Sequence, residues 1–405
     1  MSSTRTIDGF GPLPVARPSS VAELSELVRQ AAAEGKALYP VGGGTMLDYG
    51  LPPTKPGTAV ELGGLNGIID YPARDMTITV QAGFTVGRLQ EVLGAEGQQL
   101  PVDIPLPDRA TLGGAIATNA SGPRRLGYGT LRDYVIGISV LNDEGQEIKA
   151  GGRVVKNVAG YDLMKLYTGS LGTLGVITQV TLKVKPLPEA SRWVVITTVP
   201  DDVPELLARL SATRTRPCAI TIRGRAMEGR IAGASVVVGF EDNARANEWQ
   251  VARLPQELPD RARDHLHEQS GQTADALLAG LRDFPLAVKS GLTFKANVLP
   301  ARTWDFCQRA ASGAHIAFEA HAGNGIVFGH LAETNPDAAG SHLDDLLRFA
   351  GECLGNVVVT RCPTAWKSVL PVWGRPTGDR ELMKAVKEKL DPRGIFNPGR
   401  FVGGI

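Results

Sequence analysis

The stretch 111–129 has the residue types that bind an anion through the backbone. It contains five glycines among small and hydroxylated residues, including Thr118, Asn119 and Ser121, and two arginines lie toward its end. Glycine reaches positive φ without steric cost and lets the backbone approach a ligand closely, so this composition predicts backbone wrapped around a bulky group. We interpret the stretch as a site for a phosphate-bearing cofactor. Taken alone, it is equally consistent with a glycine-rich surface loop.

A second glycine-rich loop lies upstream, at 39–48. It follows a helix-like run at 21–34 and a short apolar segment at 37–39, the order expected of a strand that enters a tight anion-binding turn. The loop is not a Rossmann fingerprint, because Leu47 stands where the third glycine belongs and no long βαβ unit follows. The sequence has no Walker A motif either. Two such loops favour a cofactor site over a surface loop.

Four short motifs carry a resemblance to a known family. They are Pro-Val-Gly-Gly-Gly-Thr at 40–45, Val-Gln-Ala-Gly at 80–83, Leu-Gly-Gly-Ala-Ile-Ala-Thr-Asn at 112–119 and Gly-Thr-Leu-Gly-Val-Ile at 172–177. In order and spacing they resemble the FAD domain of the vanillyl-alcohol oxidase family, also called the p-cresol methylhydroxylase (PCMH-type) family. In that fold the first and third motifs embrace the FAD pyrophosphate, and the fourth lies against the adenine and ribose.

The end of the chain narrows the resemblance. The segment 391–401, Asp-Pro-Arg-Gly-Ile-Phe-Asn-Pro-Gly-Arg-Phe, is similar to the tail of the hydroxy-acid branch, which includes relatives of glycolate oxidase and D-lactate dehydrogenase. With the segment 156–162, Lys-Asn-Val-Ala-Gly-Tyr-Asp, it resembles most the smaller FAD-binding subunits of bacterial glycolate oxidases. The likeness covers 14–186 and the tail well and the middle of the chain poorly.

The resemblance implies a set of FAD-binding residues in the matched motifs and the tail. Some members of the family tether FAD covalently through a histidine of the first loop; Gly44 stands at that position here and no cysteine is near, so we expect non-covalent FAD. The implied cofactor residues are Pro40, Val41, Gly42, Gly43, Gly44, Thr45, Met46, Leu112, Gly113, Gly114, Ala117, Thr118, Asn119, Gly122, Gly127, Tyr128, Gly172, Gly175, Val176, Ile177 and Asn397.

Catalytic residues are harder to assign. Flavin oxidation of a 2-hydroxy acid needs a cation for the carboxylate and a base near the hydroxyl. Metal-dependent relatives carry functional histidines in a segment like His-x-Gly-Asp-Gly-Asn-x-His. The matching stretch here keeps the first as His321, but Phe328 replaces the second, and His330 comes two positions late. The candidates are His321, His330, Arg361 and Lys367, each with the alternative of a polar or solvated residue without a catalytic role.

We expect no metal site. In a strand, the two-residue offset of His330 keeps the same side of the sheet but moves the ring by roughly 7 Å, too far for the same ligand sphere. The four cysteines include no C-x-x-C pair, so zinc and iron–sulfur ligands are missing, and we expect buried free thiols.

Composition excludes several classes of partner. The 43 basic and 42 acidic residues nearly cancel, which argues against a polyanionic partner such as nucleic acid and against an anionic membrane surface. No run reaches the roughly 18 apolar residues of a membrane span, and the amino terminus lacks a signal-like pattern. We therefore expect a cytoplasmic protein, with any membrane association made through partners.

The elements that must position these residues indicate an α+β fold. Alternating apolar residues predict strands at 76–82, 134–142 and 176–184. From 292 to 360 the pattern reads β-α-β-β-α-β, the ferredoxin-like order, and the region before it is consistent with a less complete copy followed by a helical stretch to 284. We predict a PCMH-type two-lobed FAD-binding domain at 1–187, a ferredoxin-like α+β cap at 188–371, and a C-terminal segment, 372–405, that returns to the FAD domain.

These expectations combine into one functional hypothesis. The chain would be the FAD-binding subunit of a glycolate oxidase or dehydrogenase complex that oxidises 2-hydroxy acids, with a homologous flavin subunit and an iron–sulfur subunit as partners. One alternative is a stand-alone FAD-dependent dehydrogenase of the D-lactate type. Another is a flavin-holding structural subunit without turnover. The substrate, the electron acceptor and the stoichiometry do not follow from the sequence.

Overall fold

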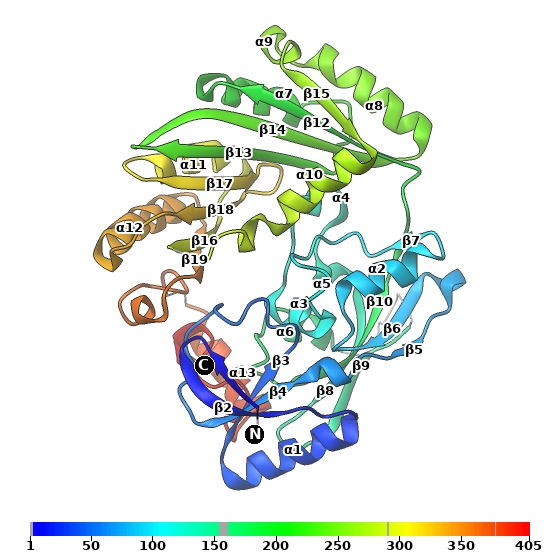
Figure 1. The fold of residues 1–405 in the computed structure, drawn as a ribbon, viewed down its shortest axis with the longest axis vertical. Coiled ribbons are helices and arrows are strands. Elements are labelled where there is room, and N and C mark those ends of the chain that lie inside the picture. The colour runs from blue at the N-terminus through cyan, green and yellow to red at the C-terminus, as the bar shows by residue number, and fades with distance from the viewer. Residues whose placement is uncertain (1–2, 154–160, 290, 377) are drawn as a thin grey trace. The chain divides into compact units, whose positions relative to one another are not determined.

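The structure is a computed structural model that describes residues 3–153, 161–289, 291–376 and 378–405. The chain divides into two compact units (Figure 1). Unit 1 comprises Met1–Ser121, Thr130–Leu187 and Pro376–Ile405, and unit 2 comprises Gly122–Gly129 and Pro188–Arg375. The domains predicted at 1–187, 188–371 and 372–405 remain a proposal. Residues 156–160 of the segment 156–162 lie outside the described residues.

Unit 1 begins with a four-stranded sheet of order β1-β2-β4-β3. Helix α1 (Val21–Glu34) starts at Ser20, whose side chain caps the N–H of Glu23, and it ends at Gly35 with φ 64°. Its apolar residues Leu24 and Val28 pack against β3 and β4, as the helical spacing of the sequence predicts. The strands are β1 (Thr4–Ile7), β2 (Phe10–Ala16), β3 (Ala37–Val41) and β4 (Gly57–Glu61).

The second sheet of unit 1 has the order β5-β6-β10-β8-β9. Its core comes from the alternation seen in the sequence, with Ile78 and Val80 of β6 beside Val180 and Leu182 of β10, all fully buried. The strands are β5 (Ile68–Asp70), β6 (Thr77–Gln81), β8 (Val135–Leu141), β9 (Glu147–Gly151) and β10 (Val176–Lys183), with a short pair β7 (Gln98–Gln99) and β11 (Lys185–Pro186). The helices are α2 (Val86–Gly94), α3 (Leu112–Thr118), α5 (Leu131–Tyr134), α6 (Leu163–Tyr167) and α13 (Arg380–Leu390).

The expectation of loop-like backbone throughout 111–129 was wrong. Residues Leu112–Thr118 form helix α3, which Thr111 caps and which ends at Asn119 in the left-handed region. The physical reason is burial: Leu112, Ala115 and Ile116 are spaced for one helical face and are buried in the core of unit 1. A short helix, α4 (Arg125–Tyr128), follows and belongs to unit 2.

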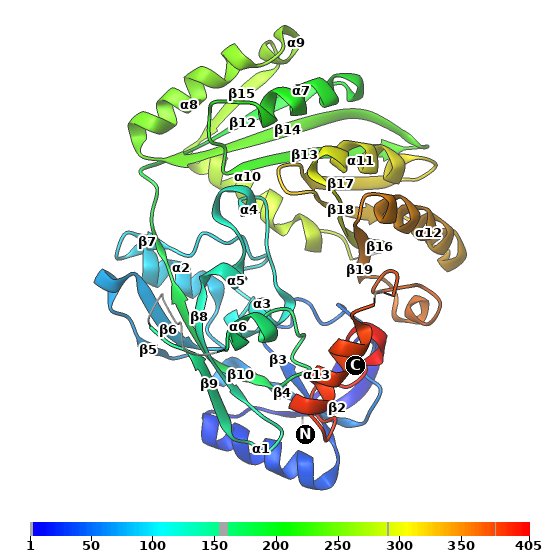
Figure 2. The ribbon, with the colours of Figure 1, turned by 180° about the vertical axis from the view of Figure 1, so that it is seen from behind.

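Unit 2 is built on an eight-stranded sheet of order β15-β12-β14-β13-β17-β18-β16-β19 (Figure 2). Each half follows the β-α-β-β-α-β order, and the halves meet where β13 pairs with β17. The first half comprises β12 (Ala190–Thr198), α7 (Val203–Ser211), β13 (Ala219–Met227), β14 (Arg230–Asp242), α8 (Ala244–Glu257), α9 (Asp260–Arg263) and β15 (Leu266–Ser270). After α10 (Gly271–Asp283), the second comprises β16 (Leu292–Asn297), α11 (Thr303–Ala311), β17 (Ile316–His321), β18 (Ile326–Leu331), α12 (Pro336–Glu352) and β19 (Asn356–Arg361).

The first half of unit 2 is thus a complete copy, and the predicted helical stretch to 284 was wrong in part, because it contains strand β15. This strand reads Leu-His-Glu-Gln-Ser and is largely exposed, so it has none of the apolar alternation by which a strand is found. It is an edge strand that pairs with β12 alone. Backbone pairing with a partner strand, which a sequence does not display, sets its conformation.

Helices cover the unit 2 sheet on both faces. Trp304 of α11 packs on Phe318 of β17, and Asn247 of α8 donates to the carbonyl of Phe240, so these helices share the face of the even-numbered residues of β17 and β14. On the opposite face α10 packs on Trp193 of β12.

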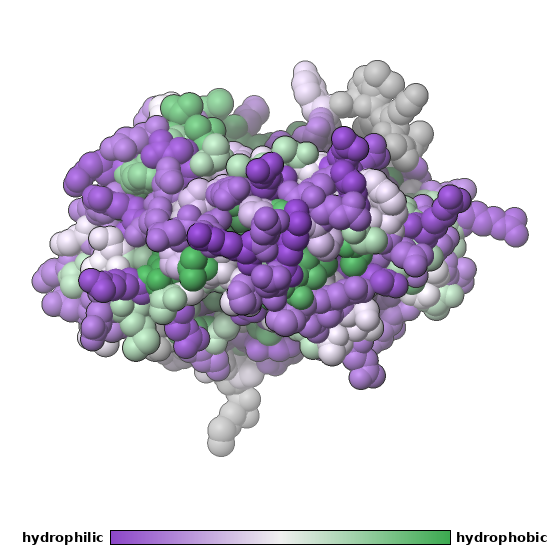
Figure 3. All heavy atoms as spheres, turned by 90° about the horizontal axis from the view of Figure 1, so that it is seen from above, coloured by the Kyte–Doolittle hydropathy of each residue, from purple (hydrophilic) through white to green (hydrophobic). Residues whose placement is uncertain are grey.

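The surface of the molecule that is visible in Figure 3 is mostly hydrophilic, and its hydrophobic residues form small separate groups. None of the helices in the described ranges is long and apolar enough to cross a membrane.

Candidate functional site

The first glycine-rich loop and the start of α3 are packed directly together in unit 1. A Cβ atom added at Gly42 would lie 2.1 Å from Oγ1 of Thr111, and one added at Gly43 would lie 1.6 Å from the carbonyl oxygen of Arg109. Both positions therefore require glycine, because a side chain at 111 and a backbone carbonyl at 109 occupy the places of their Cβ atoms. The structure brings together the two segments that the sequence predicts to embrace a pyrophosphate.

The 80–83 motif supports the same place. The N–H groups of Leu112 and Gly113 donate to the carbonyls of Phe84 and Ala82, at 2.9 and 2.8 Å. A Cβ at Gly113 would lie 2.8 Å from Cβ of Ala82, so the third motif rests on the second with no room for a larger residue. These bonds fix the beginning of α3, including Gly114, relative to the end of β6.

The fourth motif and the tail complete the arrangement. Leu171 donates its N–H to the carbonyl of Ala117 at 2.8 Å, which places the turn before Gly172 beside the end of α3. Asn397 donates its backbone N–H to Leu38 and its side-chain amide to the carbonyl of Leu171. Asn397 thus joins β3, which leads into the first loop, to the 172–177 turn. Its contacts assign it a positioning role toward both segments.

Two residues of the fourth motif point into the core. The side chains of Val176 and Ile177 in β10 are 1% and 6% exposed and pack within the apolar clusters of unit 1. Gly175 precedes them with φ 152°, and a Cβ there would lie 2.6 Å from Cγ1 of Val140. Any contact of Val176 or Ile177 with a cofactor would involve their backbone.

Gly122, Gly127 and Tyr128 belong to unit 2. Gly127 donates its N–H to Cys218 at 2.9 Å, and a Cβ there would lie 2.7 Å from the Cα of that residue. The Tyr128 hydroxyl donates to Oε2 of Glu241 at 2.8 Å, and Nη1 of Arg124 forms a 3.0 Å ion pair with Oε1 of Glu241. Burial and the Glu241 charge raise the pKa of Tyr128. The second half of the glycine-rich stretch is therefore anchored to β13 and β14.

Two observations test whether the residues present in unit 1 fit a flavin nucleotide. Gly42 and Gly43 let the first loop lie directly against the residues that precede α3, so the two segments expected to hold the pyrophosphate are side by side. Oδ1 of Asn119, at the end of α3, is buried and has no hydrogen-bond partner in the described part of the chain. A ligand donor such as a ribityl hydroxyl or a ring N–H would satisfy this atom. The residues therefore fit FAD.

The catalytic candidates lie in unit 2, and the two histidines have different hydrogen-bond partners there. His330 of β18 has both ring nitrogens occupied: Nδ1 lies 2.9 Å from Oγ1 of Thr293, and Nε2 lies 2.7 Å from the carbonyl oxygen of Phe284. Since a carbonyl only accepts, Nε2 carries the hydrogen and Nδ1 accepts from the threonine. Burial, and after it the charge of Arg361, lower the pKa of His330. His330 is thus a neutral core residue.

His321 has a different environment. Its Nε2 lies 3.3 Å from Oε1 of Glu319, two residues earlier on β17, and both side chains are almost fully buried. Its Nδ1 is buried without a hydrogen-bond partner among the described residues. Phe328 stacks edge-on against its ring, with centroids 5.6 Å apart. His321 therefore keeps an available ring nitrogen.

The two cationic candidates are less exposed than expected. Lys367 is 5% exposed and lies in a 3-10 turn at Thr364–Ser368. Arg361, at the end of β19, donates from Nη1 to the carbonyl of Val288 at 3.1 Å. The alternative of a solvated charge is wrong for Lys367, which is buried, but not for the half-buried Arg361, and a role of either in carboxylate binding stays a prediction. Across the described ranges, His, Cys, Asp and Glu residues form no group of three arranged to hold a metal ion.

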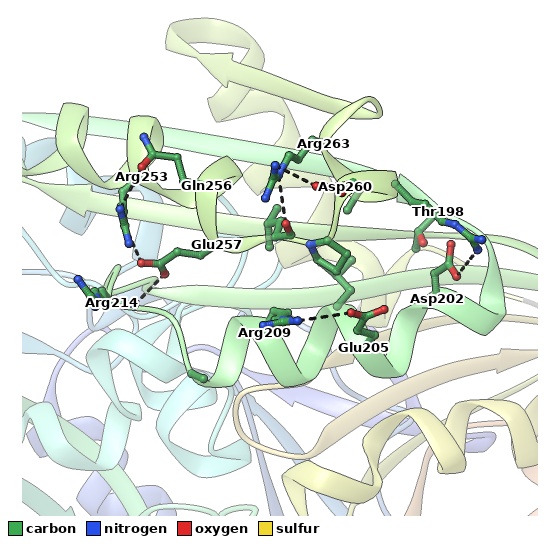
Figure 4. Close-up of a pocket in the computed structure, with 16 residues that line it drawn as sticks. Thr198, Asp202, Glu205, Arg209, Arg214, Arg253, Gln256, Glu257, Asp260 and Arg263 are labelled. Carbon is green, nitrogen blue, oxygen red and sulfur yellow. Dashed lines mark hydrogen bonds and ion pairs between the residues drawn. The ribbon is translucent and has the colours of Figure 1, made fainter.

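The structure also contains a charged pocket at α7, α8 and α9 of unit 2, of about 860 Å³ (Figure 4). Its lining includes five arginines and four acidic residues. Arg253 pairs with Glu257 at 2.7 Å and Arg263 with Asp260 at 3.0 Å, and hydrogen bonds from Thr213 and Arg253 lower the pKa of Glu257 to about 2. Because these charges compensate one another and none of the predicted site residues lies here, we assign the pocket no role in the chemistry.

Comparison with known proteins now defines the class. The pattern of the family described as FAD binding domain matches residues 12–151. The glycolate oxidase subunit GlcE of Escherichia coli K12 is 33% identical over 244 residues, 58% of this chain and 69% of that subunit. D-2-hydroxyglutarate dehydrogenase of Xanthomonas citri pv. viticola is 37% identical over 180 residues, 44% of this chain and only 38% of that protein. An alkyldihydroxyacetonephosphate synthase structure has a TM-score of 0.69 at 18% identity, covering 96% of this chain and 77% of the other.

The chain therefore belongs to the PCMH-type FAD-binding family. Within it, the chain is an FAD-linked oxidoreductase of the group that includes glycolate oxidase and 2-hydroxy-acid dehydrogenases. The predicted family is confirmed, and the shared fold of the solved structure confirms the predicted α+β architecture with its FAD-binding and cap parts. The expected buried free thiols are confirmed too, since all four cysteines are free and buried.

Sequence reasoning missed several residues that organise these sites. Thr221 was identified only when strand register placed it opposite His321, and Glu319 when its carboxylate was found 3.3 Å from Nε2 of that histidine. Glu241 lies more than 100 residues from the two side chains that it holds in the 122–129 segment. For Glu319 a signal existed, because an acidic residue in the apolar strand Ile316–His321 is rarely buried without a purpose. The register that identifies its partners does not follow from the sequence.

Proposed function

We propose that this chain is the FAD-binding subunit of a complex that oxidises small 2-hydroxy acids to 2-oxo acids, of the glycolate oxidase kind. The observation that carries the proposal is the packing of four motifs and the tail residue Asn397 against one another in unit 1, with Gly42 and Gly43 against the segment that begins α3. The 33% identity to subunit GlcE, over 69% of that subunit, supports the complex. The proposed partners are a homologous flavin subunit and an iron–sulfur subunit.

Bound FAD would supply the two-electron acceptor, and this chain's residues would hold it non-covalently. The N–H groups of Gly42 and Gly43 would face the pyrophosphate, since backbone donors stabilise an anion without a basic side chain, whereas the Gly114 N–H is donated to Oγ1 of Thr111. Thr118 donates its hydroxyl to the carbonyl of Gly114 at 2.9 Å, so its oxygen is left to accept from a ligand. Gly44 in place of a tethering histidine supports the non-covalent mode.

Electrons would leave through the partners, because the four thiols are scattered and buried and offer no cluster ligands in the described chain. Such a subunit would lie in the cytoplasm and reach a membrane only through the complex. A stand-alone dehydrogenase is the second candidate, and one observation favours it: His321 keeps an available ring nitrogen beside a buried carboxylate. The structural-subunit alternative is favoured over an independent enzyme by the eroded segment 321–330, in which Phe328 stands in place of the second histidine.

The test of the proposal has two steps. The chain is first purified and its flavin is released by denaturation; we expect free FAD, and flavin that remains on the protein band of a denaturing gel would contradict the non-covalent mode. The FAD-loaded chain is then mixed without oxygen with glycolate, D-lactate and D-2-hydroxyglutarate while flavin bleaching is followed. We expect slow or no reduction by the isolated chain and faster reduction with a homologous flavin subunit present. Fast reduction of the chain alone would establish the stand-alone dehydrogenase.

A further inference from the structure

The first glycine-rich loop of unit 1 is held at both ends by the tail of the chain. Before the loop, the carbonyl of Leu38 in β3 accepts from the N–H of Asn397 at 3.0 Å. After the loop, Leu51 donates its N–H to the carbonyl of Arg400 at 3.0 Å. Both ribbon views show the end of the chain beside the strands at its beginning (Figures 1 and 2). We call the tail residues 395–400 the clamp.

The Arg400 side chain binds the end of the loop directly. Its Nη2 donates to the carbonyls of Leu47 and Tyr49, at 2.7 and 2.8 Å. The side chain is only 6% exposed, so the guanidinium supplies these carbonyls with the donors that water would otherwise provide. Hydrogen bonds from a charged donor are stronger than those between neutral groups, and the planar guanidinium fixes their directions. Arg400 therefore fixes the path of the backbone where it leaves the loop.

The charge of Arg400 is balanced inside the protein. Its Nη1 lies 3.7 Å from Oδ2 of Asp8, whose side chain is 1% exposed. Burial lowers the pKa of Arg400, and the charges of Asp8 and Asp48 oppose this effect, so the guanidinium remains charged. A buried ion pair adds little net stability, because the loss of hydration offsets the attraction. Stability alone therefore does not explain an arginine at this place.

The clamp is packed tightly against the segment that follows the loop. Gly399 has φ 88°, and a Cβ there would lie 2.4 Å from Cγ2 of Thr54. The hydroxyl of Thr54 donates to the carbonyl of Pro398 at 3.3 Å. The positive φ and the close approach both favour glycine at 399. These contacts fix the position of Arg400 relative to the loop.

We propose that Arg400 is a positioning residue of the cofactor site, which holds the first loop in the conformation that binds the FAD pyrophosphate. It acts on the cofactor through the carbonyls of Leu47 and Tyr49, which lie where the chain leaves the loop. The cofactor rests on the proposed function, whereas the contacts of Arg400 rest on unit 1 alone. Because coupling between two sites is reciprocal, bound FAD must also stabilise the contacts of the clamp.

The first test compares the FAD affinities of variants at position 400. The full chain is freed of flavin, and FAD is titrated back while the quenching of flavin fluorescence is followed. Arg400→Met removes the donors and keeps a long side chain, and it should weaken FAD by about 10- to 100-fold, the value of a hydrogen bond to a charged group. Arg400→Lys should retain most of the affinity, because an ammonium donates to the same carbonyls. A methionine variant that binds FAD as tightly as the lysine variant would overturn the proposal.

Arg393→Met is the matched control. Arg393 lies in the same tail, but its Nη1 donates to the carbonyl of Asp143, in the turn between β8 and β9, at 2.9 Å. We expect this variant to bind FAD as the wild-type chain does. The titrations are made where every variant is fully folded, so that a lower stability alone leaves the dissociation constant unchanged. An equally large loss of affinity in Arg393→Met would show a general effect of the tail and overturn the role of Arg400.

A second ligand identifies the part of the cofactor that is affected. ADP-ribose carries the pyrophosphate but no flavin ring, and its binding is measured by calorimetry. Because the first loop is assigned to the pyrophosphate, Arg400→Met should weaken ADP-ribose and FAD by the same factor. Weakened FAD with unchanged ADP-ribose would place the effect away from the pyrophosphate, and the proposal would be wrong.

The wild-type chain provides a test that does not depend on variants that fold. Hydrogen exchange of the backbone amides is measured by mass spectrometry in the flavin-free and the FAD-loaded chain. The N–H groups of Leu51 and Thr54 donate to carbonyls of the clamp, so FAD should slow their exchange. Exchange in the turn 142–145, which lies outside these contacts, should not change. Equal exchange of the two amides with and without FAD would refute the coupling between cofactor and clamp.

The two hypotheses fail separately. A wild-type chain that neither contains nor binds FAD refutes the proposed function. A wild-type chain that binds FAD, together with an Arg400→Met chain of equal affinity, refutes the role of Arg400 and leaves the proposed function intact.

Discussion

The two histidines of β17 and β18 differ in how many of their ring nitrogens the protein occupies. His330 has both nitrogens bonded, to Thr293 and to the carbonyl of Phe284, whereas His321 has one, to Glu319. A base or a hydrogen-bond acceptor for substrate needs a free lone pair. Residue type made both histidines candidates. Only their hydrogen bonds show that His321 has a ring nitrogen available and His330 does not.

The environment of His330 predicts a pH dependence of stability. Burial lowers its pKa, with Arg361 adding to the effect, while the unfolded chain has the ordinary value near 6.5. Between these two values the unfolded state binds more protons, so the free energy of unfolding falls as the pH drops from 7 through 6.5 toward the folded pKa. The loss is about 1.4 kcal/mol for each pKa unit between the two states. Thermal unfolding of the chain from pH 7.5 to 5 measures it.

The matched variant is His330→Gln, which retains a donor for the carbonyl of Phe284 and does not titrate. We expect a shallower decline of the unfolding temperature below pH 6.5 than in the wild-type chain. Some decline should remain, because burial also lowers the pKa of His342. An identical pH profile in the two proteins would show that His330 is not held neutral by the fold.

The glycines of the first loop are needed because the loop packs closely against the start of α3. Gly43 does not need positive φ; it needs the absence of a Cβ, because the carbonyl oxygen of Arg109 occupies that position at 1.6 Å. Gly43→Ala should therefore separate the loop from the start of α3 and reduce the FAD content of the purified chain, with a stability cost of about 1–3 kcal/mol from overpacking. Flavin absorbance per chain and the unfolding midpoint measure the two effects.

Gly63→Ala is the control for this change. Gly63 lies in a 3-10 turn of the same unit, and a Cβ there would meet nothing within 4 Å. It should retain full flavin content. If Gly43→Ala also retained it, the first loop would tolerate displacement from α3, and its assignment to the pyrophosphate would be wrong.

Helix α13 fastens the tail to unit 1 through one buried lysine. The ammonium of Lys387 donates to the carbonyls of Thr173 and Phe396, at 2.7 and 2.9 Å, and to the Asp391 carboxylate. Lys387→Met would leave the fully buried Asp391 charge without its counterion. We expect a loss of about 3–5 kcal/mol, measured by urea unfolding. Lys384→Met on the exposed side of the same helix should change stability by less than about 0.5 kcal/mol.

A double variant identifies the cause. Asp391→Asn added to Lys387→Met should restore part of the lost stability, because it removes the unpaired charge, whereas two independent losses would add. A double variant that is less stable than either single one would show that the carbonyl contacts of Lys387, and not its ion pair, hold the tail.

At the scale of elements, periodicity predicted most of the fold, and its failures have identifiable causes. Strands β6 and β10 were found because their apolar residues alternate, although the structure buries residues on both faces of each strand. Helix α3 was hidden by its glycines and hydroxyl residues, which resemble a loop although Leu112, Ala115 and Ile116 have helical spacing. Strand β15 was missed because an exposed edge strand needs no apolar pattern.

The candidate site was predictable to the extent that it depends on local sequence. The glycines that permit close approach stand in short motifs, so their place in unit 1 was anticipated. The surroundings of His321 and Glu319 were not, because β17 lies beside β13 in the sheet and only strand register specifies which of their residues become neighbours. A one-residue shift of register would turn Glu319 to the opposite side of the sheet.

For the whole molecule, the chain path is less simple than three successive domains. The segment Gly122–Gly129 lies in the middle of the flavin-binding sequence and yet belongs to unit 2, where Arg124 and Tyr128 bind Glu241. The glycine-rich stretch 111–129 is therefore shared, with α3 in one compact unit and α4 in the other. Glu241 lies in β14, but its partners Arg124 and Tyr128 follow α3 in the chain. A substitution at Glu241 would therefore affect the flavin motif through these two residues.

The positions of the cysteines allow a test of how the whole chain is packed. All four thiols, Cys218, Cys307, Cys353 and Cys362, are free and buried and lie in unit 2. Burial also raises the pKa of Cys307, so the reactive thiolate is scarce at neutral pH. We expect Ellman's reagent to modify none of them rapidly in the native chain and all four after unfolding in guanidinium chloride, without a prior reducing step.

The rate of thiol exposure in intermediate denaturant then measures the opening of unit 2, while the release of flavin measures the opening of unit 1. Rapid reaction of a thiol in the native chain would contradict the packing of the strand or helix that carries it, and fewer than four thiols after unfolding would reveal a disulfide that this structure does not contain.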